Sequence, residues 1–292
     1  MNYPGVSRRT FLSGLAAAAA APLAACSPLS VVNGWVPSDT YRARTGIAFG
    51  PEARHRLDVY VPTNLKPTSS GHPVVVFFYG GNWTSGERAS YLFAGEALAA
   101  KGWVAVVPDY RLYPEVRFPA FLDDCALAVR WTLDNIGDAG GDPRQVFLMG
   151  HSAGAYNAAM LALAPDYLHA AGVERDRVRG LIGLAGPYDF LPLLGNVTKA
   201  VFGFPDTPVT TQPIHFASAS APPALLVTGG KDDIVDPGNS HRLASRLRAQ
   251  GGQAREIVYP ELGHRTLVGA LAAPFRSWAP VLDDVEAFVN AV

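Results

Sequence analysis

The segment Gly150-His151-Ser152-Ala153-Gly154 places a serine between an apolar run at residues 146–149 and a helix-like run that begins at Ala155. A serine on a sharp strand-to-helix turn presents its hydroxyl at the carboxyl edge of a sheet, and the flanking glycines let neighbouring backbones pass closely. A neutral hydroxyl is a weak nucleophile, so it needs a base that takes its proton and a third group that orients the base. The pattern therefore predicts covalent acyl chemistry at Ser152.

His264 is the histidine best placed to be that base. It lies in the loop Pro260-Glu261-Leu262-Gly263-His264, directly after a strand-like run at residues 256–259. In sheets that carry this serine turn, the chain order is serine, acid, histidine. His151 adjoins the nucleophile on the strained turn, so we expect its ring to project elsewhere. The remaining histidines either precede the turn or lack a supporting loop context, and they are His55, His72, His169, His215 and His241.

The acid is expected in the loop after the strand-like run 224–228. That loop offers three carboxylates, Asp232, Asp233 and Asp236. Asp236 precedes Pro237, a position typical of a turn or of a residue that caps the following helix. Composition and spacing alone leave Asp232 and Asp233 open. Whichever acts would accept the imidazole N–H of the base and stay ionised.

Strand-like and helix-like runs alternate along the chain, and this pattern must position the three groups. Continuous β-branched and aromatic runs indicate strands buried on both faces. The expected strands are residues 57–61, 74–79, 104–107, 146–149, 181–184, 224–228 and 256–259, and the expected helices are 89–101, 121–135, 155–164, 240–250 and 281–292. Such alternation predicts an α/β fold with a mostly parallel sheet covered on both faces.

Composition predicts one catalytic domain, over residues 46–292. The chain has 292 residues, of which 49% are hydrophobic and 17% are charged, which suffices for a sizeable core. The formal net charge is −1, and without residues 1–25, which hold Arg8, Arg9 and no acidic residue, 22 basic against 25 acidic residues give −3. A basic footprint for nucleic acid is absent, so no nucleic-acid partner is expected.

Residues 1–25 resemble an export signal of the twin-arginine type. Ser7-Arg8-Arg9-Thr10-Phe11-Leu12 precedes an alanine-rich apolar stretch that is too short for a permanent membrane span. Leu23-Ala24-Ala25-Cys26 is similar to a bacterial lipobox, which implies acylation of Cys26 and attachment to a membrane. The alternative is an ordinary signal-peptidase cut nearby. We therefore expect an exported periplasmic or cell-envelope protein, with residues 26–45 as a tether.

Several further segments resemble α/β-hydrolase fold carboxylesterases of the hormone-sensitive-lipase-like and feruloyl-esterase/arylformamidase-like branch. They are Phe78-Tyr79-Gly80-Gly81-Asn82-Trp83, Asp109-Tyr110-Arg111-Leu112-Tyr113-Pro114-Glu115, Phe118-Pro119-Ala120, Gly140-Gly141-Asp142-Pro143 and the serine turn. The resemblance runs from about residue 55 to 265. It implies the α/β-hydrolase fold with a small cap, which we place at about residues 186–216, a Pro- and Gly-rich stretch.

The resemblance also implies site residues. Its Gly-x-x-Asp spacing, counted from Gly230, selects Asp233 as the acid, with Asp232 as the alternative. Backbone N–H groups stabilise the negative oxygen that forms during attack, and Ala153 at a helix N-terminus supplies one of them. By analogy the others come from Gly81 and Asn82. Tyr79 stands where the family usually has histidine, which leaves the support of this loop open.

Three aromatic residues are candidates for the substrate pocket: Trp83, Tyr110 and Tyr188. The expected activity is that of a serine carboxylic-ester hydrolase with the triad Ser152, Asp233 and His264, acting on small to medium esters, with no metal or organic cofactor. One alternative is an arylformamidase-like amidase, because of the Gly-Gly-x-Trp loop and Gly186-Pro187-Tyr188-Asp189. Another is a non-catalytic envelope binding protein on a hydrolase scaffold.

Overall fold

The computed structural model describes Met1 and residues 28–64 and 71–292. The predicted signal, apart from Met1, and the predicted lipidation site Cys26 lie outside the described residues. In these described residues, eight strands form one sheet in the order β1-β2-β4-β3-β5-β6-β7-β8. The strands are β1 Tyr41–Ala48, β2 Arg56–Pro62, β3 His72–Phe78, β4 Val104–Pro108, β5 Gly141–His151, β6 Val178–Leu184, β7 Ala224–Gly229 and β8 Ala254–Tyr259.

Strand β2 runs antiparallel to both of its neighbours, β1 and β4, and all other pairs are parallel. This confirms the expected α/β fold with a mostly parallel sheet. Every residue of β4 and of β7 is buried, as β-branched and aliphatic runs between two helical layers require. The expected strands are all present. β1 was missed because most of its side chains are exposed, which leaves no apolar alternation to detect.

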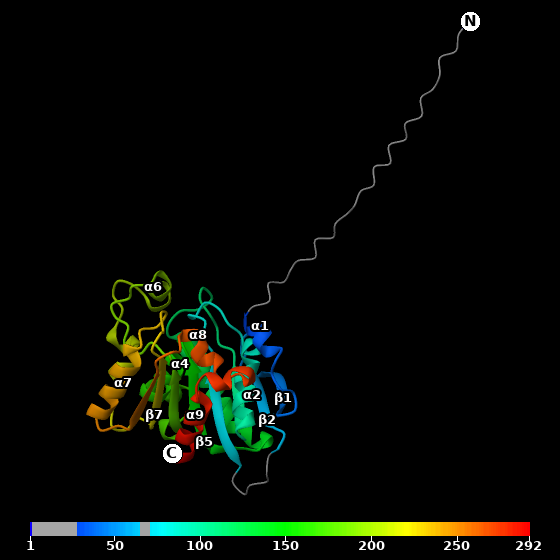
Figure 1. The fold of residues 1–292 in the computed structure, drawn as a ribbon. Helices are drawn as coiled ribbons and strands as arrows, with labels where there is room; N and C mark the ends of the chain where they lie inside the picture. Colours follow the sequence, from blue (N-terminus) through cyan, green and yellow to red (C-terminus); the bar gives the residue numbers. More distant parts are fainter. Residues whose placement is uncertain (2–27, 65–70) are drawn as a thin grey trace.

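Helices cover the sheet on both faces (Figure 1). The α-helices are α1 Pro28–Asn33, α2 Leu92–Ala100, α3 Ala120–Asn135, α4 Ala153–Leu163, α5 Pro165–Ala170, α6 Asn196–Phe202, α7 Gly238–Ala249, α8 His264–Gly269 and α9 Val281–Ala291. Short 3₁₀ helices lie at η1 Arg88–Tyr91, η2 Ile136–Ala139, η3 Arg175–Arg177, η4 Val209–Thr211, η5 Pro213–Phe216 and η6 Ala273–Trp278. Among the described residues, no helix combines the length and the apolar character needed to cross a membrane.

The stretch expected as a tether at residues 26–45 differs from its prediction where the structure describes it. Residues 28–33 form α1, and residues 41–45 already belong to β1. Asn33 ties α1 to the domain, because its Nδ2 donates to the Ala89 carbonyl at 2.9 Å and its Oδ1 accepts from the Phe93 N–H at 3.2 Å. Leu29 and Val32 also pack against the core. The folded domain therefore includes α1 and begins before residue 46.

The parallel strands bring four distant segments to one edge of the sheet. β3, β5, β7 and β8 point the same way, so their carboxyl ends meet there. The loop after β3 carries Gly80 to Trp83, β5 ends one residue before Ser152, and the loops after β7 and β8 carry the carboxylates and His264. Ligand sites of open α/β sheets form at this edge.

Candidate active site

Ser152 adopts a strained backbone conformation on the turn between β5 and α4, with φ 56° and ψ −124°. Two glycines make the turn feasible. A Cβ on Gly150 would lie 2.2 Å from the Gly154 carbonyl oxygen, and a Cβ on Gly154 would lie 2.0 Å from the Phe78 carbonyl oxygen. The predicted need for glycine on both sides of the serine is therefore a steric one. The Ser152 N–H donates to the Leu184 carbonyl at 2.9 Å, which fixes the turn to β6.

His264 begins α8 and pairs with a buried carboxylate. Its Nδ1 lies 2.8 Å from Asp232 Oδ2, and the Asp232 side chain is fully buried. An ionised carboxylate only accepts hydrogen bonds, so His264 donates from Nδ1 and its Nε2 is left to exchange a proton. His264 and Ser152 line the same cavity. This arrangement can activate a serine hydroxyl and return the proton to a departing group.

The prediction that Asp233 orients the histidine is wrong, because Asp232 holds that position. Asp232 Oδ1 accepts the N–H groups of Ile234 at 3.0 Å and Val235 at 2.9 Å, a turn that directs its side chain inward. Asp233 is exposed. The Gly-x-x-Asp spacing counted from Gly229 instead of Gly230 would have found Asp232. Asp236 accepts from the Gly238 N–H at 2.9 Å, which confirms its predicted role in the turn before α7.

The acid loop and the histidine loop touch through their backbones. The Lys231 N–H donates to the Leu262 carbonyl at 2.9 Å, and the Gly230 N–H donates to the Tyr259 carbonyl at 2.8 Å. A Cβ on Gly229 would lie 2.2 Å from the Leu262 carbonyl oxygen. Only glycine allows this approach, which brings the carboxylate and imidazole within hydrogen-bond distance.

Asp232 remains ionised across the neutral range. Burial acts to raise its pKa, but the hydrogen bonds from His264 and from the Val235 and Ile234 N–H groups outweigh burial, so the pKa is lowered. An ionised Asp232 holds His264 in one tautomer and favours the imidazolium that forms when His264 accepts a proton.

The loop after β3 has positive φ at three consecutive residues, two of which are not glycine. Gly81, Asn82 and Trp83 have φ values of 139°, 54° and 58°. A Cβ on Gly81 would lie 2.0 Å from the Ser85 carbonyl oxygen, so the turn needs glycine there. Within the described part of the chain, no hydrogen bond engages the N–H groups of Gly81, Asn82 or Ala153. The three residues, which are the predicted oxyanion donors, also line the cavities at Ser152. Their N–H groups are therefore free to bind an anion there.

Tyr79, which stands where the family usually has histidine, supports this loop through its hydroxyl group. Its hydroxyl accepts from Arg54 Nη2 at 2.7 Å and donates to Asp109 Oδ1 at 2.9 Å. Arg54 also donates to the carbonyls of Gly86 and Tyr110, at 2.7 and 2.8 Å. A partly buried network of charges thus holds both ends of the loop. Sequence reasoning missed Arg54, because no motif surrounds it.

The His151 ring lies between Gly80, in the loop after β3, and His264. This differs from the expectation that the ring projects elsewhere. Its Nε2 lies 3.0 Å from the His264 carbonyl oxygen, and the two imidazole rings are 4.7 Å apart. A carbonyl only accepts, so Nε2 carries the proton and Nδ1 carries the lone pair. Burial, followed by the nearby His264, lowers the pKa of His151 to about 3. His151 is therefore neutral at ordinary pH.

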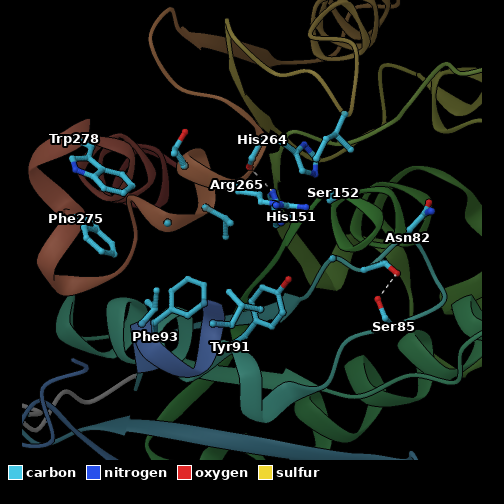
Figure 2. Close-up of a pocket in the computed structure, with 18 of the residues that line it drawn as sticks. Asn82, Ser85, Tyr91, Phe93, His151, Ser152, His264, Arg265, Phe275 and Trp278 are labelled. Atoms are coloured by element: carbon cyan, nitrogen blue, oxygen red, sulfur yellow. Dashed lines mark hydrogen bonds between the residues drawn. The ribbon is translucent and has the colours of Figure 1, made fainter. Parts of the chain in front are cut away.

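Two cavities formed by described residues meet at Ser152. The His264 chamber, of about 650 Å³, is lined by His264 and by apolar side chains of α1, η1, α2, α8 and η6. Figure 2 shows Tyr91 and Phe93 on one side of it and Phe275 and Trp278 on another, with Ser152 and both histidines at its inner end. The cap chamber, of about 680 Å³, is lined by Trp83, Ala153 and the segment around α6. Ser152, Asn82 and Ile234 border both chambers.

Of the three residues predicted for the substrate pocket, only Trp83 lines either of these two chambers. Trp83 lines the cap chamber, and its Nε1 donates to Asn157 Oδ1 at 3.1 Å. Tyr110 and Tyr188 are fully buried and line neither chamber. Tyr110 donates instead to the Tyr79 carbonyl at 2.8 Å, and Tyr188 packs on Gly183, where a Cβ would lie 1.9 Å from its hydroxyl. Both are structural supports, a role that aromatic residues near a site can serve equally well.

The predicted cap, residues 186–216, forms part of the wall of the cap chamber. Phe190, Leu194 and Val197 all come from residues 186–216 and line the cap chamber. Arg242 of α7 fixes this segment, because its Nε donates to Asp189 Oδ2 at 2.6 Å. Within the described ranges, no group of three or more His, Cys, Asp or Glu side chains is arranged to hold a metal ion.

Comparison with known sequences gives one family match and several relatives. The sequence model of the family described as BD-FAE matches residues 57–247. The chain is 28% identical over 313 residues to an Arabidopsis thaliana protein named isoprenylcysteine alpha-carbonyl methylesterase ICME, covering 100% of this chain and 72% of that protein. It is 31% identical over 260 residues to esterase LipQ of Mycobacterium tuberculosis, covering 82% of this chain and 61% of LipQ. Among these and other curated relatives, the chain spans 54–72% of the relative's own length.

Solved structures share the fold. Esterase B from Lactobacillus rhamnosis, inhibited by a tributyrin phosphonate, superposes with a TM-score of 0.77 at 19% identity, covering 90% of each chain. Esterase 2 of Thermogutta terrifontis with bound butyrate gives a TM-score of 0.68 at 20% identity, covering 85% of this chain and 94% of that one. At these identities the likeness establishes a common architecture.

Proposed function

Because the chain belongs to the BD-FAE family of α/β-hydrolase carboxylesterases, we propose that it is a serine hydrolase that cleaves small to medium carboxylic esters through an acyl-enzyme. The observation that carries the proposal is the hydrogen bond of 2.8 Å between His264 and buried Asp232, beside a strained Ser152 on the same cavity. Relatives whose structures hold butyrate or a tributyrin phosphonate support esters of short acyl groups.

In the proposed mechanism, Ser152 Oγ attacks the ester carbonyl while His264 Nε2 takes the hydroxyl proton. Asp232 stabilises the imidazolium and stays ionised. The N–H groups of Gly81, Asn82 and Ala153 bind the negative oxygen, and Ala153 stands at the N-terminus of α4, where the helix dipole also favours an anion. His264 then protonates the departing alcohol. A water molecule, activated by the same histidine, hydrolyses the acyl-enzyme.

The first experiment measures hydrolysis of p-nitrophenyl acetate, butyrate and octanoate and of an aryl formamide, by the wild type and by Ser152→Ala. We expect ester turnover that falls at least about 10⁴-fold in the variant, and labelling of wild-type Ser152 by a fluorophosphonate. Formamide turnover far above that of every ester would establish the amidase instead. A folded wild type that neither hydrolyses esters nor takes the label would indicate a binding protein.

We also propose that the protein is exported and anchored to a membrane through acylated Cys26. The twin-arginine pattern and the lipobox-like Leu23-Ala24-Ala25-Cys26 support this. Mass spectrometry of the N-terminal peptide from protein made in a bacterium with a lipoprotein pathway should find a diacylglyceryl-modified Cys26. An unmodified Cys26, or an N-terminus elsewhere, would refute the anchor and leave the esterase proposal untouched.

A further inference from the structure

The two chambers at Ser152 differ in which catalytic groups reach them. His264 lines the His264 chamber and does not line the cap chamber, whereas Ala153 lines the cap chamber and does not line the His264 chamber. Of the other two predicted oxyanion donors, Gly81 lines only the His264 chamber and Asn82 lines both chambers. The proton-carrying group therefore faces the His264 chamber alone, whereas the oxyanion donors lie along the boundary between the two spaces. An ester bound at Ser152 has two arms, the acyl group and the alcohol group, so the two spaces can each receive one.

The chemistry decides which arm enters which chamber. After attack, the former carbonyl carbon carries four groups: Ser152 Oγ, the negative oxygen, the acyl carbon and the alkoxy oxygen. The intermediate collapses when the bond to the alkoxy oxygen breaks and His264 gives that oxygen the proton first taken from Ser152. Nδ1 of His264 is engaged by Asp232, so the proton comes from Nε2, and the alkoxy oxygen must lie within hydrogen-bond reach of Nε2.

We propose that the His264 chamber holds the alcohol part of the ester and the cap chamber holds the acyl part, and that the natural substrates are esters of bulky apolar alcohols. This inference rests on the proposed esterase function. The alcohol leaves toward the side that His264 lines, and the negative oxygen stays at the Gly81, Asn82 and Ala153 N–H groups between the two chambers. The acyl group, bonded to the same carbon, then extends to the other side of Ser152.

The lining of the His264 chamber selects the alcohol. Tyr91 and Phe93 are buried at one wall, and Val32 of α1 adds an aliphatic surface. Phe275 and Trp278 stack on each other with ring centroids 4.3 Å apart, and Trp278 is 48% exposed at the rim (Figure 2). A cavity of about 650 Å³ with such walls suits a cyclic or aryl alcohol, which gains by leaving water.

The cap chamber has a more polar wall. Arg242 lines it together with Asp189 and Asp236, and the guanidinium is paired with both carboxylates at 2.6 and 3.1 Å. Leu194, which is 83% exposed, and Val197 of α6 contribute to its apolar part together with Trp83 and Phe190. This space is open enough for a short acyl group. Trp83 and Phe190 are its aromatic residues, whereas the His264 chamber has the aromatic rings of Tyr91, Phe93, Phe275 and Trp278.

A matched pair of substitutions tests the assignment. Val32 in α1 and Val197 in α6 are both half-buried valines on short helices, and each lines one chamber only. Val32→Trp and Val197→Trp are compared with the wild type on two series of esters. The first series keeps the acetyl group and varies the alcohol from ethyl to cyclohexylmethyl to naphthylmethyl. The second keeps the ethyl group and varies the acyl chain from acetate to butyrate to hexanoate.

Val32→Trp should lower the ratio of kcat/KM for the naphthylmethyl to the ethyl ester about tenfold, the scale on which filled pockets discriminate, and leave the acyl-chain ratio as in the wild type. Val197→Trp should do the reverse. Trp278→Ala, at an exposed rim, provides a second variant, and it should lower the same alcohol ratio by removing apolar contact. The reverse assignment of the two ratios, or no change in either ratio in folded variants, would overturn the proposal.

The outcomes also separate this inference from the esterase function. If the wild type hydrolyses no member of either series and a fluorophosphonate does not label Ser152, the proposed function itself fails. If the esters are hydrolysed but a bulky alcohol lowers wild-type kcat/KM relative to the ethyl ester, the enzyme is an esterase and the substrate class is wrong. Circular dichroism of each variant distinguishes lost folding from lost selectivity.

Discussion

The loop after β3 and the loop after β7 both border Ser152, but they are fixed in opposite ways. Side-chain charges hold the first, because the Tyr79 hydroxyl joins Arg54 to Asp109 beneath it. Backbone contacts hold the second, because Gly229 and Gly230 let it lie directly against the loop that carries His264. The position of the loop after β3, here called the oxyanion side, therefore depends on hydrogen bonds between polar side chains. The position of the loop after β7, the acid side, depends on glycines that have no side chain.

This difference determines which substitutions each side can tolerate. On the oxyanion side, removal of one oxygen weakens a network whose other members remain paired, for Arg54 Nη2 and Asp109 Oδ1 are also 3.6 Å apart. On the acid side, addition of a single methyl group meets a backbone carbonyl that cannot move without moving His264. The first kind of change should be graded and the second severe.

The largest effect is expected at the acid itself. Asp232→Asn removes the charge that orients His264 and favours its imidazolium, so kcat for a p-nitrophenyl ester should fall about 10⁴-fold, as loss of the acid does in serine triads generally. Asp233→Asn is the matched control, because its exposed side chain lies one residue away, and it should change kcat less than about twofold. Inactivation by Asp233→Asn instead would show that the loop rearranges when substrate binds.

Gly229→Ala should have the next largest effect. Its Cβ would lie 2.2 Å from the Leu262 carbonyl oxygen, so the loops must separate, and a misplacement of about 1 Å costs on the order of 10²-fold in kcat/KM. Gly137→Ala serves as control, because nothing lies within 4 Å of its Cβ position. Steady-state kinetics and thermal unfolding of both variants check this. Wild-type activity in Gly229→Ala would mean that the contact between the loops is unimportant for catalysis.

Tyr79→Phe should have a smaller effect. The change removes the hydroxyl between Arg54 and Asp109, so the loop that offers the Gly81 and Asn82 N–H groups loses one support. We expect a loss of about 1–3 kcal/mol in the free energy of unfolding and a decrease in kcat of about tenfold with little change in KM.

Tyr167→Phe is the control for Tyr79→Phe, since the Tyr167 hydroxyl makes no hydrogen bond within the described residues. Urea unfolding and kinetics on one ester suffice for both variants. If Tyr79→Phe raised KM and left kcat unchanged, the Tyr79 network would support substrate binding and not the oxyanion loop.

The sequence predicted the parts of the site that depend on local chain geometry. The turn at Ser152 follows from two glycines between a strand and a helix, and the position of His264 follows from a loop after a strand. Alternating runs also predicted the parallel sheet and most of its helices. Short or exposed elements such as β1 and α1 escaped, because they bury little apolar surface and leave little periodicity.

The sequence could not decide matters that depend on which way one side chain points. Asp232 and Asp233 are neighbours in a turn, and only the bonds from Ile234 and Val235 to Asp232 determine which of them faces His264. Tyr110 and Tyr188 occur in segments near the site, yet both rings turn into the core. Arg54 reaches Tyr79 across 25 positions of sequence, and no local pattern encodes such a contact.

The smallest expected effect concerns His151, which lies against both the oxyanion side and the acid side. Its Nε2 reaches the His264 carbonyl, and a Cβ on Gly80 would lie 3.1 Å from its Nδ1. Burial, followed by His264, lowers its pKa from the ordinary 6.5 to about 3. Between these two pH values the unfolded chain binds a proton that the folded protein does not. This contribution to stability is therefore full above pH 6.5 and decreases as the pH falls toward 3, by at most about 1.4 kcal/mol per pH unit.

His151→Gln should remove this part of the slope when the free energy of unfolding is measured in urea between pH 7 and 4. His169→Gln is the control, because the His169 side chain is 77% exposed, and it should keep the wild-type slope. If His151→Gln kept that slope as well, the acid sensitivity would come from other groups. A third outcome is that His151→Gln loses the slope and also lowers kcat, while the Asp232 and Tyr79 contacts persist. The two sides would then be coupled through His151, and they could not be treated as separately held by charges and by backbone contacts.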